Sequence, residues 1–101
     1  MSPAVRFVPA ARDELREAAA WYEERRSGLG DQFVDAVEVA LELIVDWTAA
    51  GTPVEIGAHD VRRLSVIGFP YHLPYRVVGD WIEIVAVAHD RRRPAYWAGR
   101  T

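Results

Sequence analysis

The chain has 101 residues, half of them hydrophobic, and a formal net charge of −3. This length supports one hydrophobic core and predicts a single domain over residues 1–101. The absence of cysteine excludes disulfides, thiol catalysis and cysteine-based zinc sites. No apolar run reaches the ~20 residues of a membrane span and the N-terminus has no signal-peptide pattern, so we expect a soluble cytoplasmic protein.

The charge is unevenly distributed along the chain. Residues 1–58 carry five arginines against eleven acidic residues, whereas residues 59–101 carry seven arginines against four. The second half is therefore the expected surface for an anionic partner.

The first half of the chain predicts one short strand followed by two helices. Residues 5–8 have the pattern of a strand, and Pro9 marks the start of a helix over residues 10–26. A Gly-rich break separates this helix from a second amphipathic helix over residues 31–48. So short a break predicts two antiparallel helices. The acidic stripe of the second helix is interpreted as a solvated face.

The second half predicts three strands, over residues 61–66, 71–78 and 81–89. The two-residue loop Gly79-Asp80 is a hairpin signal. Pro74 has no N–H to donate and predicts a bulge or an unpaired amide at its position. The connection over residues 54–60 has no pattern that assigns it to a helix or a strand.

The hairpin allows the pairing of these strands to be derived. If Val78 faces Trp81, then Arg76 faces Glu83, and His72 lies diagonal to His89 within side-chain reach. One face of the sheet would then be the core, covered by the helical hairpin, and would carry Leu64, Val66, Tyr71, Leu73, Tyr75, Val77, Ile82, Ile84, Ala86 and Ala88. The opposite face would carry Arg63, Ser65, His72, Arg76, Glu83 and His89. A slip of one residue would bury these charges, so the pattern favours this register.

The polar face has the side chains that phosphate chemistry requires. Arginines can hold a phosphodiester and stabilise the charge that grows on it, and a histidine can move a proton near neutral pH. The candidates are Arg63, Arg76, His72 and His89, with Arg91, Arg92, Arg93 and Tyr96 just beyond the sheet. The alternative is structural, with an ion pair between Arg76 and Glu83 and a solvated basic edge. The three histidines lack metal-ligand spacing, so no metal site is expected.

Several short motifs resemble, in their order and spacing, the RelE/ParE superfamily of toxins from bacterial type II toxin–antitoxin systems. They include Phe7-Val-Pro9-Ala-Ala-Arg-Asp-Glu-Leu15, Gly30-Asp-Gln-Phe33, Val61-Arg-Arg-Leu64, Gly68-Phe-Pro-Tyr71, Pro74-Tyr-Arg76-Val and Ile84-Val-Ala-Val-Ala-His89-Asp-Arg-Arg-Arg-Pro94. The resemblance implies an α+β fold of order β-α-α-β-β-β, in which a helical hairpin packs on one face of an antiparallel sheet. It also implies a cognate antitoxin protein that wraps the toxin along its helices or at a sheet edge, in a hetero-oligomer.

The resemblance leaves three functions open. RelE-like members cut mRNA in the ribosomal A site without metal or cofactor, and ParE-like members inhibit DNA gyrase as binding modules that need no catalytic set. The third possibility is an inactive relative that only binds its partner. Our first hypothesis is the ribosome-dependent mRNA endoribonuclease. It assigns catalysis to Arg63, Arg76, His89 and Tyr96, and target binding to His72, Arg91, Arg92 and Arg93.

Overall fold

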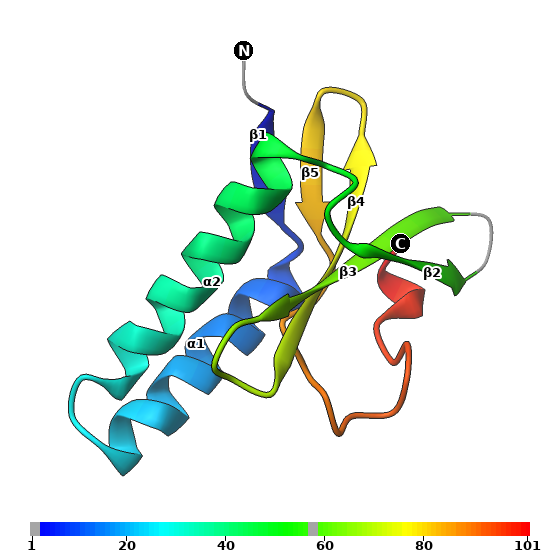
Figure 1. Cartoon of the computed structure of the whole chain (residues 1–101). Coiled ribbons are helices and arrows are strands. Elements are labelled where there is room, and N and C mark those ends of the chain that lie inside the picture. Colours follow the sequence, from blue (N-terminus) through cyan, green and yellow to red (C-terminus); the bar gives the residue numbers. More distant parts are fainter. Residues whose placement is uncertain (1–2, 57–58) are drawn as a thin grey trace.

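The computed structural model describes residues 3–56 and 59–101, and it contains a helical hairpin beside a six-stranded sheet (Figure 1). The chain runs through β1 (Ala4–Phe7), α1 (Pro9–Arg25), α2 (Leu29–Asp46), β2 (Thr52–Ile56), β3 (His59–Val66), β4 (Tyr71–Val78), β5 (Trp81–Ile84) and β6 (Ala88–His89). A short 3₁₀ helix, η1 (Ala98–Arg100), follows. The predicted α+β fold is confirmed.

The two helices are joined by the predicted short break. Pro9 begins α1, where its missing N–H leaves no helical hydrogen bond unmade. Gly28, with a φ of 87°, makes the turn before α2. The Glu23 carboxylate of α1 accepts hydrogen bonds from the N–H groups of Gly28 and Gly30, both at 3.0 Å. These bonds satisfy free donors at the start of α2 and attach it to α1.

One face of the sheet packs against both helices and forms the main core. Its buried side chains are Ala11, Ala18, Phe33, Val37, Ala40, Ile44, Val66, Leu73, Tyr75, Ile82, Ile84 and Val87. Phe33 of α2 is fully buried and lies 5.0–5.3 Å, between ring centroids, from Tyr22, Phe69 and Tyr71. Burial of this apolar surface is the main force that holds the helices on the sheet.

The opposite face of the sheet is covered at one end by the C-terminal segment. Trp97 is only 2% exposed and packs in a second buried cluster with Val61, Val85, Ala86 and Ala88. Figure 1 shows this segment, in orange and red, on the side of the sheet away from the helices. The polar face that we expected to be open is therefore partly closed by the chain itself.

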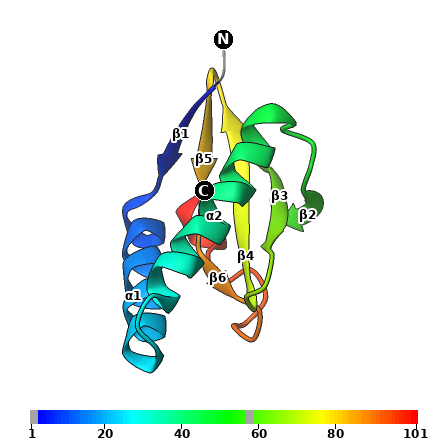
Figure 2. The ribbon, with the colours of Figure 1, turned by 60° about the vertical axis from the view of Figure 1, so that its left-hand side comes forward.

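The sheet is mixed, not antiparallel throughout as predicted. The strand order is β1-β5-β4-β3-β2, which can be followed across Figure 2, and β6 pairs with β4. β1 runs parallel to β5, whereas the other pairs are antiparallel. Since two helices separate β1 from the later strands, no tight turn dictates its direction. Part of the unassigned connection forms β2, and residues 57–58 of that connection lie outside the described residues.

The predicted strand over residues 81–89 is interrupted by a bulge. Tyr75 pairs with Ile84, as predicted, but Tyr71 pairs with His89. The chain over residues 85–87 therefore holds one residue more than the β4 segment opposite it. Pro74 lies at this point, and its carbonyl accepts a hydrogen bond from Val85 N at 2.8 Å. Because Pro74 cannot return a hydrogen bond, the ladder breaks here.

The bulge exchanges the two faces of the sheet for the residues that follow it. Ala86 and Ala88, predicted on the helix side, pack instead with Trp97 on the far side, and Val87 joins the main core. His89 faces Tyr71 and is no longer diagonal to His72. The predicted register before the bulge is confirmed for the Arg76–Glu83 and Ser65–His72 pairs.

Candidate functional site

The segment of residues 89–93, here called the basic segment, leaves the sheet at β6. Arg91, Arg92 and Arg93 are all exposed. The backbone of the segment is ordered by local hydrogen bonds, from Asp90 N to Pro70 O at 2.9 Å and from Arg92 N to His89 O at 3.0 Å. The chain therefore presents three guanidinium groups to solvent on a backbone that is tied to the sheet.

Six of the eight predicted site residues line one hollow of about 270 Å³ beneath the basic segment. They are Arg63, His72, His89, Arg92, Arg93 and Tyr96. Glu55 and Asp90 line the same hollow, so its charge is mixed. Arg91 is not among the lining residues.

Arg76 lies apart from this group. Its Nε donates to Glu83 Oε1 at 2.9 Å, and both side chains are about one-fifth exposed. Arg76 lines a different hollow of about 220 Å³, together with Arg62 and Asp60. The structure forms the Arg76–Glu83 ion pair that the register predicted, and it does not bring Arg76 together with Arg63 and His89.

The two histidines of the hollow have different surroundings. His72 is almost buried, and its Nδ1 lies 2.8 Å from Asp90 Oδ1, so this nitrogen carries a proton that it donates to the carboxylate. His89 packs edge-on against Tyr71 at 5.0 Å between centroids. Its Nδ1 accepts a hydrogen bond from Arg91 N at 3.0 Å, so neutral His89 carries its proton on Nε2.

Tyr96 belongs to a set of contacts that we call the Glu14 network. Tyr96 Oη donates to Glu14 Oε2 at 2.7 Å. Arg100 donates to both carboxylate oxygens of Glu14, at 2.8 and 3.1 Å. Burial, and then the hydrogen bond to Glu14, raise the pKa of Tyr96 well above its ordinary value. The phenol therefore stays protonated and acts as a hydrogen-bond donor.

The Glu14 network also satisfies the backbone groups that the bulge leaves unpaired. Pro74 has no N–H to donate to Val85 O. This carbonyl instead accepts a hydrogen bond from Arg100 Nη1 at 3.1 Å. Val87 N donates to Glu14 Oε1 at 3.1 Å. Because an unpaired buried backbone group is costly, these two side chains are what make the bulge tolerable. Sequence reasoning missed Glu14 and Arg100, and the missing N–H of Pro74 was the one available signal.

The Glu14 network predicts a stability that depends on pH. Burial by itself would raise the pKa of Glu14, but hydrogen bonds from Arg100, Tyr96 and Val87 and the charge of Arg100 together lower it below 4.5. A lowered carboxyl pKa adds stability above the unfolded value, and this stability is lost as the pH falls through the folded value. We therefore expect Glu14→Gln to cost about 1.5–3 kcal/mol at pH 7, and this cost to shrink below pH 4.5.

Urea unfolding of both proteins between pH 3 and pH 8 measures this difference. A difference that stays constant down to pH 3 would contradict the assignment of the lowered pKa to Glu14.

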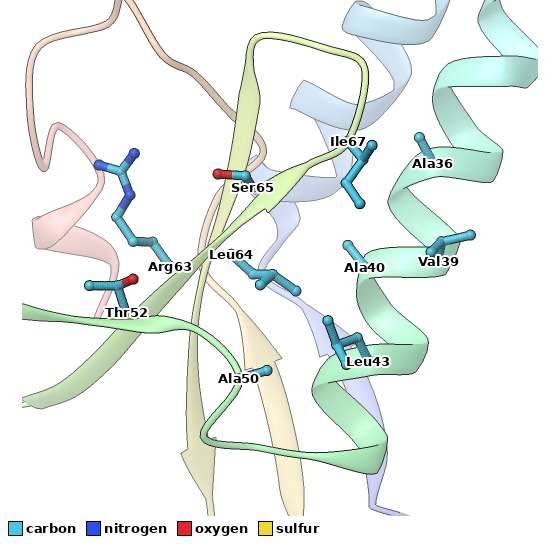
Figure 3. A pocket seen from close by; sticks show the side chains of 10 residues that line it. All are labelled: Ala36, Val39, Ala40, Leu43, Ala50, Thr52, Arg63, Leu64, Ser65 and Ile67. Atoms are coloured by element: carbon cyan, nitrogen blue, oxygen red, sulfur yellow. The ribbon is translucent and has the colours of Figure 1, made fainter.

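A larger groove, of about 590 Å³, lies between α2 and β3 (Figure 3). Figure 3 shows Ala40 and Leu43 of α2 on one side and Leu64 and Ile67 on the other, while Arg63 and Ser65 point away from the helix. Three large apolar side chains at the groove are well exposed: Val39 at 58%, Leu43 at 44% and Ile67 at 82%. The same helix also exposes four acidic residues, Asp35, Glu38, Glu42 and Asp46. The groove is therefore an exposed apolar surface on a helix that is otherwise acidic.

In residues 3–56 and 59–101, no group of three or more histidine or acidic side chains is arranged to hold a metal ion. No helix of that part of the chain is long and apolar enough to cross a membrane.

Comparison with known proteins identifies the family. The model of the ParE toxin of the type II toxin–antitoxin system parDE matches residues 5–94, which is most of the chain. The chain belongs to the ParE toxin family. The RelE/ParE resemblance is thereby confirmed, and the protein is the toxin component of a toxin–antitoxin pair.

A solved structure agrees with the fold of this ParE family member. The structure described as the chromosomal ParDE TA system from P. aeruginosa has a chain that is 21% identical, with a TM-score of 0.74. The alignment covers 87% of this chain and 96% of that chain. No curated protein matches. At this identity the similarity extends to the fold alone.

Proposed function

We propose that this toxin arrests growth by binding DNA gyrase through the basic segment, without a catalytic step of its own. One observation carries the proposal: groups that a nuclease would use are engaged in contacts within the protein. Arg76 is paired with Glu83 and Tyr96 with Glu14, whereas Arg91, Arg92 and Arg93 are exposed. Gyrase is the target that the resemblance assigns to the ParE branch, and the family match supports that branch. Gyrase acts in the cytoplasm, where we expect the protein to be.

A ribosome-dependent endoribonuclease remains the second candidate. The hollow that holds Arg63, His72 and His89 favours it, since the groups fit a phosphodiester and the His72 ring is oriented by Asp90. This candidate predicts that His89→Ala and Arg63→Ala each abolish growth arrest in a folded protein. Under the first proposal Arg63→Ala keeps its toxicity, because Arg63 lies on β3 and outside the basic segment.

The two candidates are separated by parallel assays of the purified toxin, in gyrase supercoiling and in cell-free translation with mapping of mRNA ends. Loss of supercoiling with intact mRNA supports gyrase inhibition. Cleavage at codon-spaced positions that requires ribosomes would replace it with the nuclease. A protein with no effect in either assay, and none on growth, would be an inactive relative that only binds its partner.

Charge reversal in the basic segment tests where the target binds. We expect half-maximal inhibition of supercoiling to require an at least about tenfold higher concentration of the double variant Arg91→Glu/Arg93→Glu. The new carboxylates would be repelled by the target surface that the arginines bind. Arg92 is left unchanged, since its guanidinium stacks on Tyr96 at 4.1 Å.

The matched control is Arg16→Glu/Arg26→Glu, which makes the same charge change on exposed positions of α1 and just beyond it. Unchanged potency of the Arg91/Arg93 variant, or an equal loss in the control, would exclude the basic segment as the contact.

The antitoxin is proposed to occupy the groove between α2 and β3. The apolar lining with Val39, Leu43 and Ile67 fits the apolar stripe of an amphipathic helix. The acidic residues along α2 favour basic side chains beside that stripe. The groove and the basic segment lie on different elements, so neutralisation and target binding can be changed separately by mutation.

A further inference from the structure

The Glu14 network holds both ends of the loop that carries the basic segment. Val87, which donates its N–H to Glu14, comes two residues before His89. Tyr96, which donates its hydroxyl to the same carboxylate, comes three residues after Arg93. Arg100 closes the network with two further hydrogen bonds to Glu14. One side chain of α1 therefore fixes where the loop leaves the sheet and where it returns.

The loop contains a backbone conformation that its local sequence does not favour. Ala95 has a φ of 57°, in the left-handed region that residues with a side chain seldom adopt. Such a conformation persists where the surrounding contacts determine it, and it is common in functional segments. Ala95 is held between Pro94 and two anchored aromatic residues, Tyr96 on Glu14 and the buried Trp97.

The network is connected to the exposed arginines by direct contact. The Arg92 guanidinium stacks on the Tyr96 ring, whose hydroxyl is bound to Glu14. The Glu14 side chain itself is only 16% exposed, on the inner side of this contact. From these contacts we infer that Glu14 is a positioning residue, which sets the arrangement of Arg91, Arg92 and Arg93 without touching the target. The inference rests on the proposed role of the basic segment in target binding.

A positioning role predicts that loss of the Glu14 carboxylate loosens the loop and leaves the rest of the fold in place. Trp97 packs against Val61, Val85 and Ala86 through contacts that do not involve Glu14, so we expect the end of the chain to stay attached when the carboxylate is lost. The loop between β6 and Trp97 is then free to open locally while the rest of the fold is retained. The antitoxin groove at α2 and β3 does not include the network and should be unaffected.

Tryptic cleavage reports the order of this loop directly, because trypsin cuts after Arg91 and Arg92, whereas the bond between Arg93 and Pro94 resists it. We expect Glu14→Gln to raise the rate of cleavage after Arg91 and Arg92 about tenfold under native conditions, since charge-assisted bonds that close the loop are lost. Half-maximal inhibition of supercoiling should need about tenfold more toxin, and antitoxin affinity should stay within about twofold of the unchanged protein.

The matched control is Glu24→Gln, which makes the same chemical change at an exposed position of α1 that does not line the hollow beside Tyr96 and Arg92. It should change neither cleavage nor potency. Arg100→Gln should reproduce the effects of Glu14→Gln, and the double variant should be no worse than either single variant, because all three break the same pair. If Glu14→Gln fails to fold, Arg100→Lys carries the test, since it keeps the charge and loses the bidentate geometry.

Two results would overturn the inference. One is an unchanged rate of tryptic cleavage in Glu14→Gln. The other is faster cleavage with undiminished potency, which would make Glu14 a structural residue only. If the unchanged toxin leaves gyrase unaffected, the proposed target is wrong, and growth arrest in cells then replaces supercoiling as the measure of potency in the same comparison.

Discussion

Replacement of Leu43 by glutamate is expected to weaken antitoxin binding at least about thirtyfold, which corresponds to about 2 kcal/mol. Leu43 is 44% exposed and lines the groove between α2 and β3, so a partner that fills the groove would have to bury the new carboxylate without a counter-charge. The acidic residues along α2 would add repulsion against any further negative charge. Titration calorimetry of the toxin with its cognate antitoxin measures the loss.

The toxin itself should be little affected by this change. Because Leu43 is already partly in water, the fold should lose no more than about 1 kcal/mol, and growth arrest in the absence of antitoxin should be retained. The control is Gln32→Glu, which adds the same charge at an exposed position of α2 that does not line the groove. Equal antitoxin affinity of Leu43→Glu and Gln32→Glu would show that the antitoxin binds elsewhere.

Gly51→Ala is expected to destabilise the fold by about 2–4 kcal/mol, through overpacking and loss of a buried hydrogen bond. A Cβ at this position would lie 2.8 Å from Arg63 O and 2.8 Å from the Tyr75 ring and hydroxyl. Tyr75 Oη accepts a hydrogen bond from Gly51 N and donates one to Thr48 O, which ties the chain after α2 to the sheet. Movement of either neighbour would disturb these bonds, and urea unfolding measures the cost.

Gly99→Ala is the matched control for Gly51→Ala. No atom lies within 4 Å of a Cβ built at Gly99, so the same substitution there should change the free energy of unfolding by less than about 0.5 kcal/mol. A small effect at Gly51 as well would mean that Tyr75 can move aside without loss.

The sequence determined both helices and the pairing of β4 with β3 and with β5. Helical periodicity and Pro9 predicted α1 to within a residue at each end, and the Gly79-Asp80 turn determined the pairing of Arg76 with Glu83. These signals are local, because they depend on residues within a few positions of each other along the chain. The order and spacing of the motifs also carried enough information to recognise the family before the fold was known.

The tertiary structure decided what became of the predicted polar face. Pro74 predicted an irregularity in the strand pairing. Which strand holds the extra residue depended on the side chains that can form hydrogen bonds with the unpaired backbone groups. Glu14 and Arg100 form these hydrogen bonds, and 86 positions separate the two residues in the chain. No local sequence pattern can predict such a pair, because the pair stabilises the protein only when folding buries both groups at the same point in space. For the same reason the exchange of faces at His89, the separation of Arg76 from the hollow, and the closing of the far face by Trp97 could be seen only in the folded chain.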